Sequence, residues 1–150
     1  MHPTAERIQQ QLRELGLQSE VRELADSTRT AQEAASAVGV ELGQIVKSLV
    51  FVDEHGPLLC LCAGDRRVDT GKLGPGARQA RGDEVRQATG FAIGGVPPLG
   101  HDRPVRTVVD SSLRRFDVVW CAAGTPHAVF PVAPDELIAS IPGVVVEDVS

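Results

Sequence analysis

The chain has 150 residues, 42% of them hydrophobic, and a formal net charge of −5 at pH 7. This length and apolar content suit one core, so we expect a single domain over residues 1–150. No apolar run reaches the ~18 residues that span a membrane, and no secretory signal opens the chain. We therefore expect a soluble, cytoplasmic protein with no membrane partner. The acidic balance also argues against a bulk nucleic-acid binder, and we expect no DNA partner.

The charges are unevenly distributed along the chain. Between Arg66 and Arg115 there are ten Lys or Arg residues and five Asp or Glu residues, whereas the remainder carries five basic and fifteen acidic residues. Such asymmetry either orients an acidic partner on one face or reflects an ordinary solvated surface.

Three cysteines, Cys60, Cys62 and Cys121, are an odd number without metal-ligand spacing. We expect reduced, buried thiols and no disulfide framework. Zinc-protease, phosphate-loop and serine-hydrolase motifs are missing from the sequence. We therefore expect no metal, no cofactor and no covalent nucleophile.

The first third of the chain alternates helices and strands. The expected elements are a helix at 3–17 capped by Thr4, a strand at 18–24, a helix at 31–38 capped from within 26–30 and ended by Gly39, and a helical turn from Glu41. A buried strand at 44–52 follows, and Gly56-Pro57 predicts a hairpin turn into an antiparallel strand at 58–63.

The strand at 44–52 contains one charged residue, Lys47. Period-2 alternation places Lys47 on the face of Leu49 and opposite Ser48. Because an ammonium group is costly to desolvate, Lys47 either snorkels to water, pairs with another group or meets an anionic ligand.

The rest of the chain reads as short elements joined by tight turns. We expect a helical turn at 68–73, a helix at 83–89, a strand from Phe91 that enters a rigid loop, strands at 105–109, 116–122, 128–132 and 144–149, and helices at 111–115 and 134–141. This order predicts an α+β fold with a mixed, mostly antiparallel, barrel-like sheet core and flanking helices.

Two glycine-containing segments are candidate ligand loops. Gly94-Gly95-Val96-Pro97-Pro98 combines conformational freedom with fixed φ angles, which suits a loop whose N–H groups approach a ligand, although many such clusters are only turns. Gly124-Thr125-Pro126-His127 holds a histidine after a turn, at a cleft edge or simply on the surface.

Five features occur in a fixed order along the chain: Thr30 opening an alanine-rich helix, Lys47 in its strand, Gly94-x-x-x-Pro98, Asp110 before a short helix, and Gly124 to His127. In this order they resemble the YbaK-like aminoacyl-tRNA deacylases. These are free-standing relatives of the editing domain of bacterial prolyl-tRNA synthetases. The resemblance covers residues 5–141. It implies a compact mixed α/β domain that hydrolyses the ester between a wrong amino acid and its tRNA.

The resemblance also implies roles for individual residues. Lys47 matches the strand lysine beside the 3′-terminal adenosine, and the loop that contains Gly94 and Gly95 matches the one whose amides face the scissile carbonyl. Pro98 closes that loop. The remaining matches are His127 and Gly124 in the second glycine turn, and Thr30 and Asp110 as pocket or support positions.

The implied chemistry requires positioning more than a strong nucleophile, because an aminoacyl ester is already activated. Amides of Gly94 and Gly95 would hold the oxyanion, and Lys47 would hold the terminal phosphate or ribose. His127 would either serve as a base or only shape the pocket. The expected substrate is a small amino acid such as alanine or cysteine on tRNA-Pro. The partners would be the tRNA acceptor end and prolyl-tRNA synthetase.

Two alternatives stay open. One is a catalytically degenerate protein of the same fold that only binds tRNA or a synthetase, although a docking protein would need neither Lys47 nor the Gly94–Pro98 loop. The other is hydrolysis of a different small acyl ester.

Overall fold

The computed structural model describes residues 1–25 and 30–150. Its α-helices are α1 (Pro3–Glu14), α2 (Ala31–Val38), α3 (Gly82–Thr89) and α4 (Pro134–Ala139), and its 3₁₀ helices are Leu42–Gln44, Thr70–Lys72 and Ser111–Arg115. The strands are β1 (Arg22–Glu23), β2 (Val46–Asp53), β3 (Gly56–Ala63), β4 (Arg78–Gln79), β5 (Arg106–Asp110), β6 (Val119–Ala122), β7 (Ala128–Val132) and β8 (Val145–Glu147). None of the described helices is long and apolar enough to cross a membrane.

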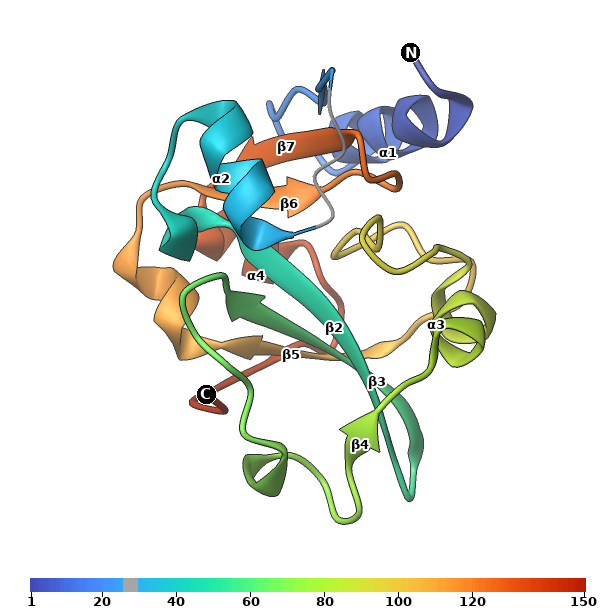
Figure 1. Ribbon diagram of the computed structural model, residues 1–150. Coiled ribbons are helices and arrows are strands. Elements are labelled where there is room, and N and C mark those ends of the chain that lie inside the picture. The colour runs from blue at the N-terminus through green and yellow to red at the C-terminus, as the bar shows by residue number, and fades with distance from the viewer. Residues whose placement is uncertain (26–29) are drawn as a thin grey trace.

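The strands form two sheets (Figure 1). The larger has the order β4-β2-β3-β5-β8, with β2 antiparallel to both β3 and β4, and with β3, β5 and β8 parallel. The smaller has the order β1-β7-β6 and is antiparallel. A parallel bridge between Ile45 and Trp120 joins the sheets, so the start of β2 lies beside β6.

The two faces of β2 have different surroundings. Val46 and Val50 pack into the main core, which also holds Leu59, Leu61, Phe130 and the buried face of α1. Phe51 belongs to a smaller cluster on the opposite face, with Leu49 packed against it. The alternation expected along this strand is therefore confirmed.

Local sequence signals explain α2 well. Thr30 is its N-cap, with an extended backbone and a side-chain oxygen that accepts a hydrogen bond from the N–H of Glu33 at 3.1 Å. Gly39 ends the helix in the left-handed conformation, where a side chain would be strained. The predicted bounds of α2 are confirmed. Residues 26–29, which the sequence offered as further caps, lie outside the described residues.

Among the expectations that were wrong, three concern a helix cap and two turns, while the expected helix at 3–17 and strands at 18–24 and 116–122 are shorter than predicted. The N-cap of α1 is His2, whose imidazole accepts from the N–H of Thr4, so Thr4 lies inside the helix. The hairpin turn is formed by residues 54–55, because the register pairs Asp53 with Gly56 and places Pro57 within β3. The segment after Phe91 is not a strand, because residues 92–95 form a turn in which Gly94 has a φ of 90°.

The fold class is confirmed as α+β with mixed, mostly antiparallel sheet pairing and flanking helices. The strands divide into two joined sheets where a single sheet was expected. Where the two sheets meet, between β2 and β6, the structure has a cavity.

Candidate active site

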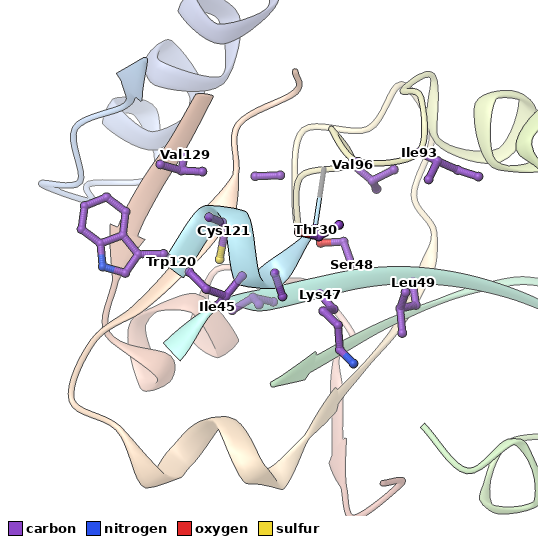
Figure 2. Close-up of a pocket in the computed structure, with 15 residues that line it drawn as sticks. Thr30, Ile45, Lys47, Ser48, Leu49, Ile93, Val96, Trp120, Cys121 and Val129 are labelled. Carbon is purple, nitrogen blue, oxygen red and sulfur yellow. The ribbon is translucent and has the colours of Figure 1, made fainter. Parts of the chain in front are cut away.

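A cavity of about 260 Å³ lies between α2, the first half of β2, the loop at 93–96, and the strands β6 and β7 (Figure 2). Its lining is mostly apolar: Thr30, Ala31, Ala34, Ile45, Val46, Lys47, Ser48, Leu49, Ile93, Gly94, Val96, Trp120, Cys121, Ala122 and Val129. Pockets for drug-sized ligands span roughly 300–1,000 Å³. The cavity therefore suits a small group.

Small residues allow α2 to lie close to β2. Ala34 and Ala35 are buried against Ile45, and Ala31 packs on the same cluster. Beneath the helix, a Cβ on Gly64 would lie 2.4 Å from the carbonyl oxygen of Leu42, so only glycine fits there. The alanine-rich sequence thus sets the width of the cavity on its α2 side.

The two polar side chains in the first half of β2 point to opposite sides. Figure 2 shows Ser48 on the side of Thr30 and Val96, and the Lys47 ammonium on the other side of the strand. The ammonium donates a hydrogen bond to the carbonyl oxygen of Arg66. Lys47 is the sole charged residue lining the cavity in the described chain. Since an ammonium has three hydrogens, two remain for another acceptor.

The loop at 93–96 contributes Ile93, Gly94 and Val96 to the cavity lining. The Gly95 N–H is already bonded to the carbonyl oxygen of Ala92 at 3.0 Å. For the N–H groups of Gly94 and Val96, by contrast, no acceptor is found within the described part of the chain. The N–H groups of Gly94 and Val96 thus lie on either side of the Gly95 N–H, which closes the turn.

The two glycine-containing turns touch each other. A Cβ on Gly95 would lie 3.0 Å from both the carbonyl oxygen of Gly124 and the Cα of Thr125. Gly124 itself has a φ of 96°, in the region that favours glycine. The second turn therefore supports the first from behind.

The other expected site residues lie outside this cavity. Pro98 lines a second hollow together with Gln11 and His101. His127 and Gly124 line a third hollow, on the α1 side of the glycine turns. Of the expected set, the structure therefore brings together Thr30, Lys47 and Gly94 at the cavity, with Gly95 directly behind it.

Asp110 is fully buried and lies outside the cavity. Its carboxylate accepts hydrogen bonds from the Val149 N–H at 2.8 Å, the Ser150 hydroxyl at 3.0 Å, and the N–H and hydroxyl of Ser112. Burial raises its pKa, but these bonds outweigh burial and hold the pKa below its ordinary value. Asp110 thus caps the helix Ser111–Arg115 and anchors the segment after β8.

The three cysteines are buried and reduced, as expected. Burial raises the pKa of Cys60 to about 12 and that of Cys62 to about 11, and it also raises the pKa of Cys121, which lines the cavity. At neutral pH these thiols are therefore protonated. The described residues contain no cluster of three or more His, Cys, Asp or Glu side chains arranged to hold a metal ion.

Sequence reasoning missed Ser48 and Trp120 as cavity residues. Ser48 had a detectable signal, because it is a hydroxyl between two valines on one face of a buried strand. Nothing in the sequence indicated that β6 would supply a wall of the cavity, since the contact between β2 and β6 joins distant segments.

The family described as "Aminoacyl-tRNA editing domain" matches residues 25–139. The chain belongs to this family. The matched segment includes α2, β2, the glycine loop and β6, so all the elements that form the cavity lie within the editing domain.

Relatives of this editing domain occur both alone and inside synthetases. The uncharacterized protein YwhH of Bacillus subtilis (strain 168) is 36% identical over 125 residues, covering 80% of each chain. A candidate Cys-tRNA(Pro)/Cys-tRNA(Cys) deacylase, EbsC of Enterococcus faecalis (strain ATCC 700802 / V583), is 23% identical over 73% of this chain and 71% of its own. The proline–tRNA ligase of Thermosipho africanus (strain TCF52B) is 32% identical over 93 residues, which are 59% of this chain and only 16% of the ligase.

Solved structures show the same editing-domain fold. A crystal structure described as a candidate trans-editing enzyme for prolyl-tRNA synthetase superposes with a TM-score of 0.91 at 49% identity, covering 100% of this chain and 98% of the other. The resemblance found in the sequence is therefore confirmed.

Proposed function

We propose that this protein is a trans-editing deacylase that hydrolyses mischarged aminoacyl-tRNA, with a small amino acid such as alanine or cysteine on tRNA-Pro as its substrate. The observation that carries the proposal is the small apolar cavity, one wall of which is a loop with two N–H groups that have no acceptor in the described chain. Lys47, in the adjoining strand β2, extends its ammonium to the other side of that strand. Membership of the editing-domain family and the EbsC relative support it.

In the proposed reaction, the aminoacyl group occupies the cavity and its carbonyl faces the loop at 93–96. A water oxygen attacks the carbonyl carbon, and the N–H groups of Gly94 and Val96 stabilise the oxyanion. The bond to the ribose oxygen then breaks, that oxygen takes a proton derived from the water, and the amino acid and tRNA leave. The N–H of Gly95 closes the turn instead, because it donates a hydrogen bond to the carbonyl oxygen of Ala92.

Lys47 is proposed to hold the terminal ribose or phosphate of the tRNA. Its two unused ammonium hydrogens suit such an oxygen. Arg66, whose carbonyl oxygen Lys47 contacts, and the next residue, Arg67, are both exposed. His127 lies in the hollow behind the glycine turns, where Arg7 and Arg86 also lie. We therefore propose for His127 a contact with the acceptor strand in place of the role of a base.

The cavity size supports the choice of substrate. One methylene discriminates between ligands by only ~1–3 kcal/mol, so a synthetase for proline cannot fully reject smaller amino acids. A second site that admits only small side chains can remove them. The cavity walls of alanine and valine residues suit such a sieve.

Single-turnover deacylation of tRNA-Pro charged with alanine or cysteine tests the proposal. The wild type should hydrolyse at least one of them, and Lys47→Ala should slow it by at least ~10²-fold through the loss of a positioned charge. Lys72→Ala is the matched control, since the chain's other lysine contacts Asp148 and Ser150 away from the cavity and should keep full activity.

The same assay separates the enzyme from a degenerate binding protein. A docking protein would bind uncharged and charged tRNA equally and hydrolyse neither. Absence of wild-type hydrolysis across a panel of mischarged tRNAs, with tRNA binding retained, would therefore replace the proposed activity by docking.

A further inference from the structure

Ser48 carries a polar group that the fold leaves unused. Its side chain lies on the face of β2 that lines the cavity, between Thr30 and the loop at 93–96 (Figure 2). The hydroxyl oxygen is buried and has no hydrogen-bond partner among the described residues. A buried hydroxyl without a partner destabilises the folded protein. Such a group in a cavity wall is typical of a site that a ligand completes.

The described side chains around Ser48 provide no hydrogen-bond partner for its hydroxyl. The side chains of Ala34, Val96 and Val129 across the cavity are apolar. The Thr30 hydroxyl is engaged, since it accepts from the Glu33 N–H at 3.1 Å and donates to the Glu33 carboxylate at 2.9 Å. Ser48 is thus the side-chain hydroxyl in the described cavity lining that remains free for an occupant.

We propose that Ser48 determines which aminoacyl group the cavity accepts, by hydrogen bonding to the hydroxyl or thiol of a small substrate side chain. The inference rests on the proposed deacylase function and narrows its substrate to serine- or cysteine-type esters. Size alone cannot make this choice, because an apolar pocket discriminates weakly between side chains that differ only by a hydroxyl. A site with a buried polar group instead rejects an analogue that leaves the group unpaired.

A bond from Ser48 to the substrate's α-amine is the competing arrangement. Every amino acid carries that amine, so such a bond would raise the rate for all substrates by one factor. A bond to the side chain raises it only for substrates with a polar side-chain atom. The two arrangements therefore differ in the pattern across substrates.

The experiment compares single-turnover kcat/KM of the wild type and Ser48→Ala on tRNA-Pro carrying serine, cysteine, alanine or 2-aminobutyrate, which has a methyl group where cysteine has its thiol. We expect the wild type to prefer cysteine to 2-aminobutyrate by roughly tenfold, the worth of one buried hydrogen bond. In Ser48→Ala the preference should shrink to about twofold or less, because the serine and cysteine rates fall and the other two rates hold.

Ser36→Ala is the matched control. Ser36 lies on the exposed face of α2 and its hydroxyl accepts from Gln32, so its removal should leave the substrate preference unchanged. The thermal midpoint of Ser48→Ala should equal or exceed that of the wild type, since the substitution removes an unpaired hydroxyl.

Three results overturn the inference. If the wild type is active and Ser48→Ala keeps its preference, Ser48 does not read the side chain. If all four rates fall equally, Ser48 holds the amine. If the wild type hydrolyses none of the four esters, the proposed function fails, and the role of Ser48 fails with it.

Discussion

Two buried side chains in this fold, Asp110 and Ser48, differ in how their polar groups are satisfied. The carboxylate of Asp110 accepts four hydrogen bonds and does not line the cavity, whereas the hydroxyl of Ser48 faces the cavity and has no hydrogen-bond partner among the described residues. A satisfied buried carboxylate stabilises the fold, and an unsatisfied buried hydroxyl does not. The two residues are therefore expected to respond in opposite ways to substitution.

Asp110→Asn should lower the free energy of unfolding by about 1–3 kcal/mol, because an amide cannot accept from all four donors. The pKa of Asp110 is lowered in the folded state, so its contribution is complete above the unfolded pKa of about 3.9 and is lost as pH falls through the folded pKa. The gap between wild type and variant should therefore close in strong acid. Urea unfolding between pH 7 and pH 2 measures it.

Asp117→Asn provides the control, since Asp117 is exposed and has no hydrogen bond from another residue in the described structure. It should leave stability nearly unchanged at every pH. A gap for Asp110→Asn that stays constant into strong acid would mean that its carboxylate is not charged in the native state.

At the scale of elements, the glycine loop depends on its neighbours for its shape. Gly94 turns the chain at a positive φ, the Gly95 N–H closes the turn on Ala92, and the turn at Gly124 packs behind it. His101 adds a hydrogen bond from its ring Nε2 to the carbonyl oxygen of Pro97 at 2.7 Å. The loop is held at both ends and from behind, which suits amides that must be placed before a substrate arrives.

Gly94→Ala and Gly95→Ala should each reduce turnover by at least about tenfold, because displacing the loop misplaces its amides. At Gly94 the cause is strain at positive φ, and at Gly95 it is contact with the backbone of Gly124 and Thr125. Affinity for tRNA should change by less than about tenfold, since distributed charges carry it. Single-turnover rates and binding are measured on the same variants.

Gly76→Ala controls for the strain alone. Gly76 has a φ of 71°, a Cβ there meets nothing within 4 Å, and it lies away from the cavity. It should lose stability like Gly94→Ala and keep full turnover. Equal losses of binding and turnover in the two loop variants would instead identify the loop as a docking surface.

For the molecule as a whole, many of the basic side chains between Arg66 and Arg115 are paired with carboxylates in the folded structure. Six of the ten cations between Arg66 and Arg115 lie within 4 Å of a carboxylate: Lys72, Arg78, Arg81, Arg106, Arg114 and Arg115. In the described structure Arg66, Arg67, Arg86 and Arg103 have no such partner. Lys47 contacts the carbonyl oxygen of Arg66, and Arg67 follows it, so under the proposed function this pair is expected to meet tRNA phosphates.

A double variant, Arg66→Gln with Arg67→Gln, should weaken tRNA binding and reduce the slope of log affinity against log salt by about 1–2, since each phosphate contact contributes roughly 0.7–0.9. Arg78→Gln with Arg81→Gln is the comparison, because both guanidinium groups already pair with carboxylates on α3. Fluorescence anisotropy of labelled tRNA at several salt concentrations measures both slopes. Equal slopes in the two variants would place the tRNA elsewhere.

The sequence predicted the elements whose signals are local. Thr30 and Gly39 defined α2 because capping depends on a few adjacent residues. The alternation along β2 correctly separated Lys47 from Ser48, yet it could not tell which face bears the cavity. That depends on where β6 and α2 pack, which local patterns do not encode.

The expected position of His127 shows the same limit. The sequence predicted the turn at Gly124 to His127, and in the structure this turn contacts Gly95. The histidine itself points into the hollow on the α1 side, because β7 begins at Ala128 and the pairing of β7 with β1 fixes the direction of the chain. Side-chain direction after a turn follows from such tertiary pairing.

Trp120 forms part of the cavity wall, and it is the only tryptophan of a chain that has no tyrosine. Ultraviolet emission of the native protein therefore comes from one indole ring at the proposed site, with no background from other strong fluorophores. A ligand that enters the cavity changes the polarity around that ring. Binding of a non-hydrolysable aminoacyl-adenosine can consequently be titrated on the unlabelled protein, separately from any catalytic readout.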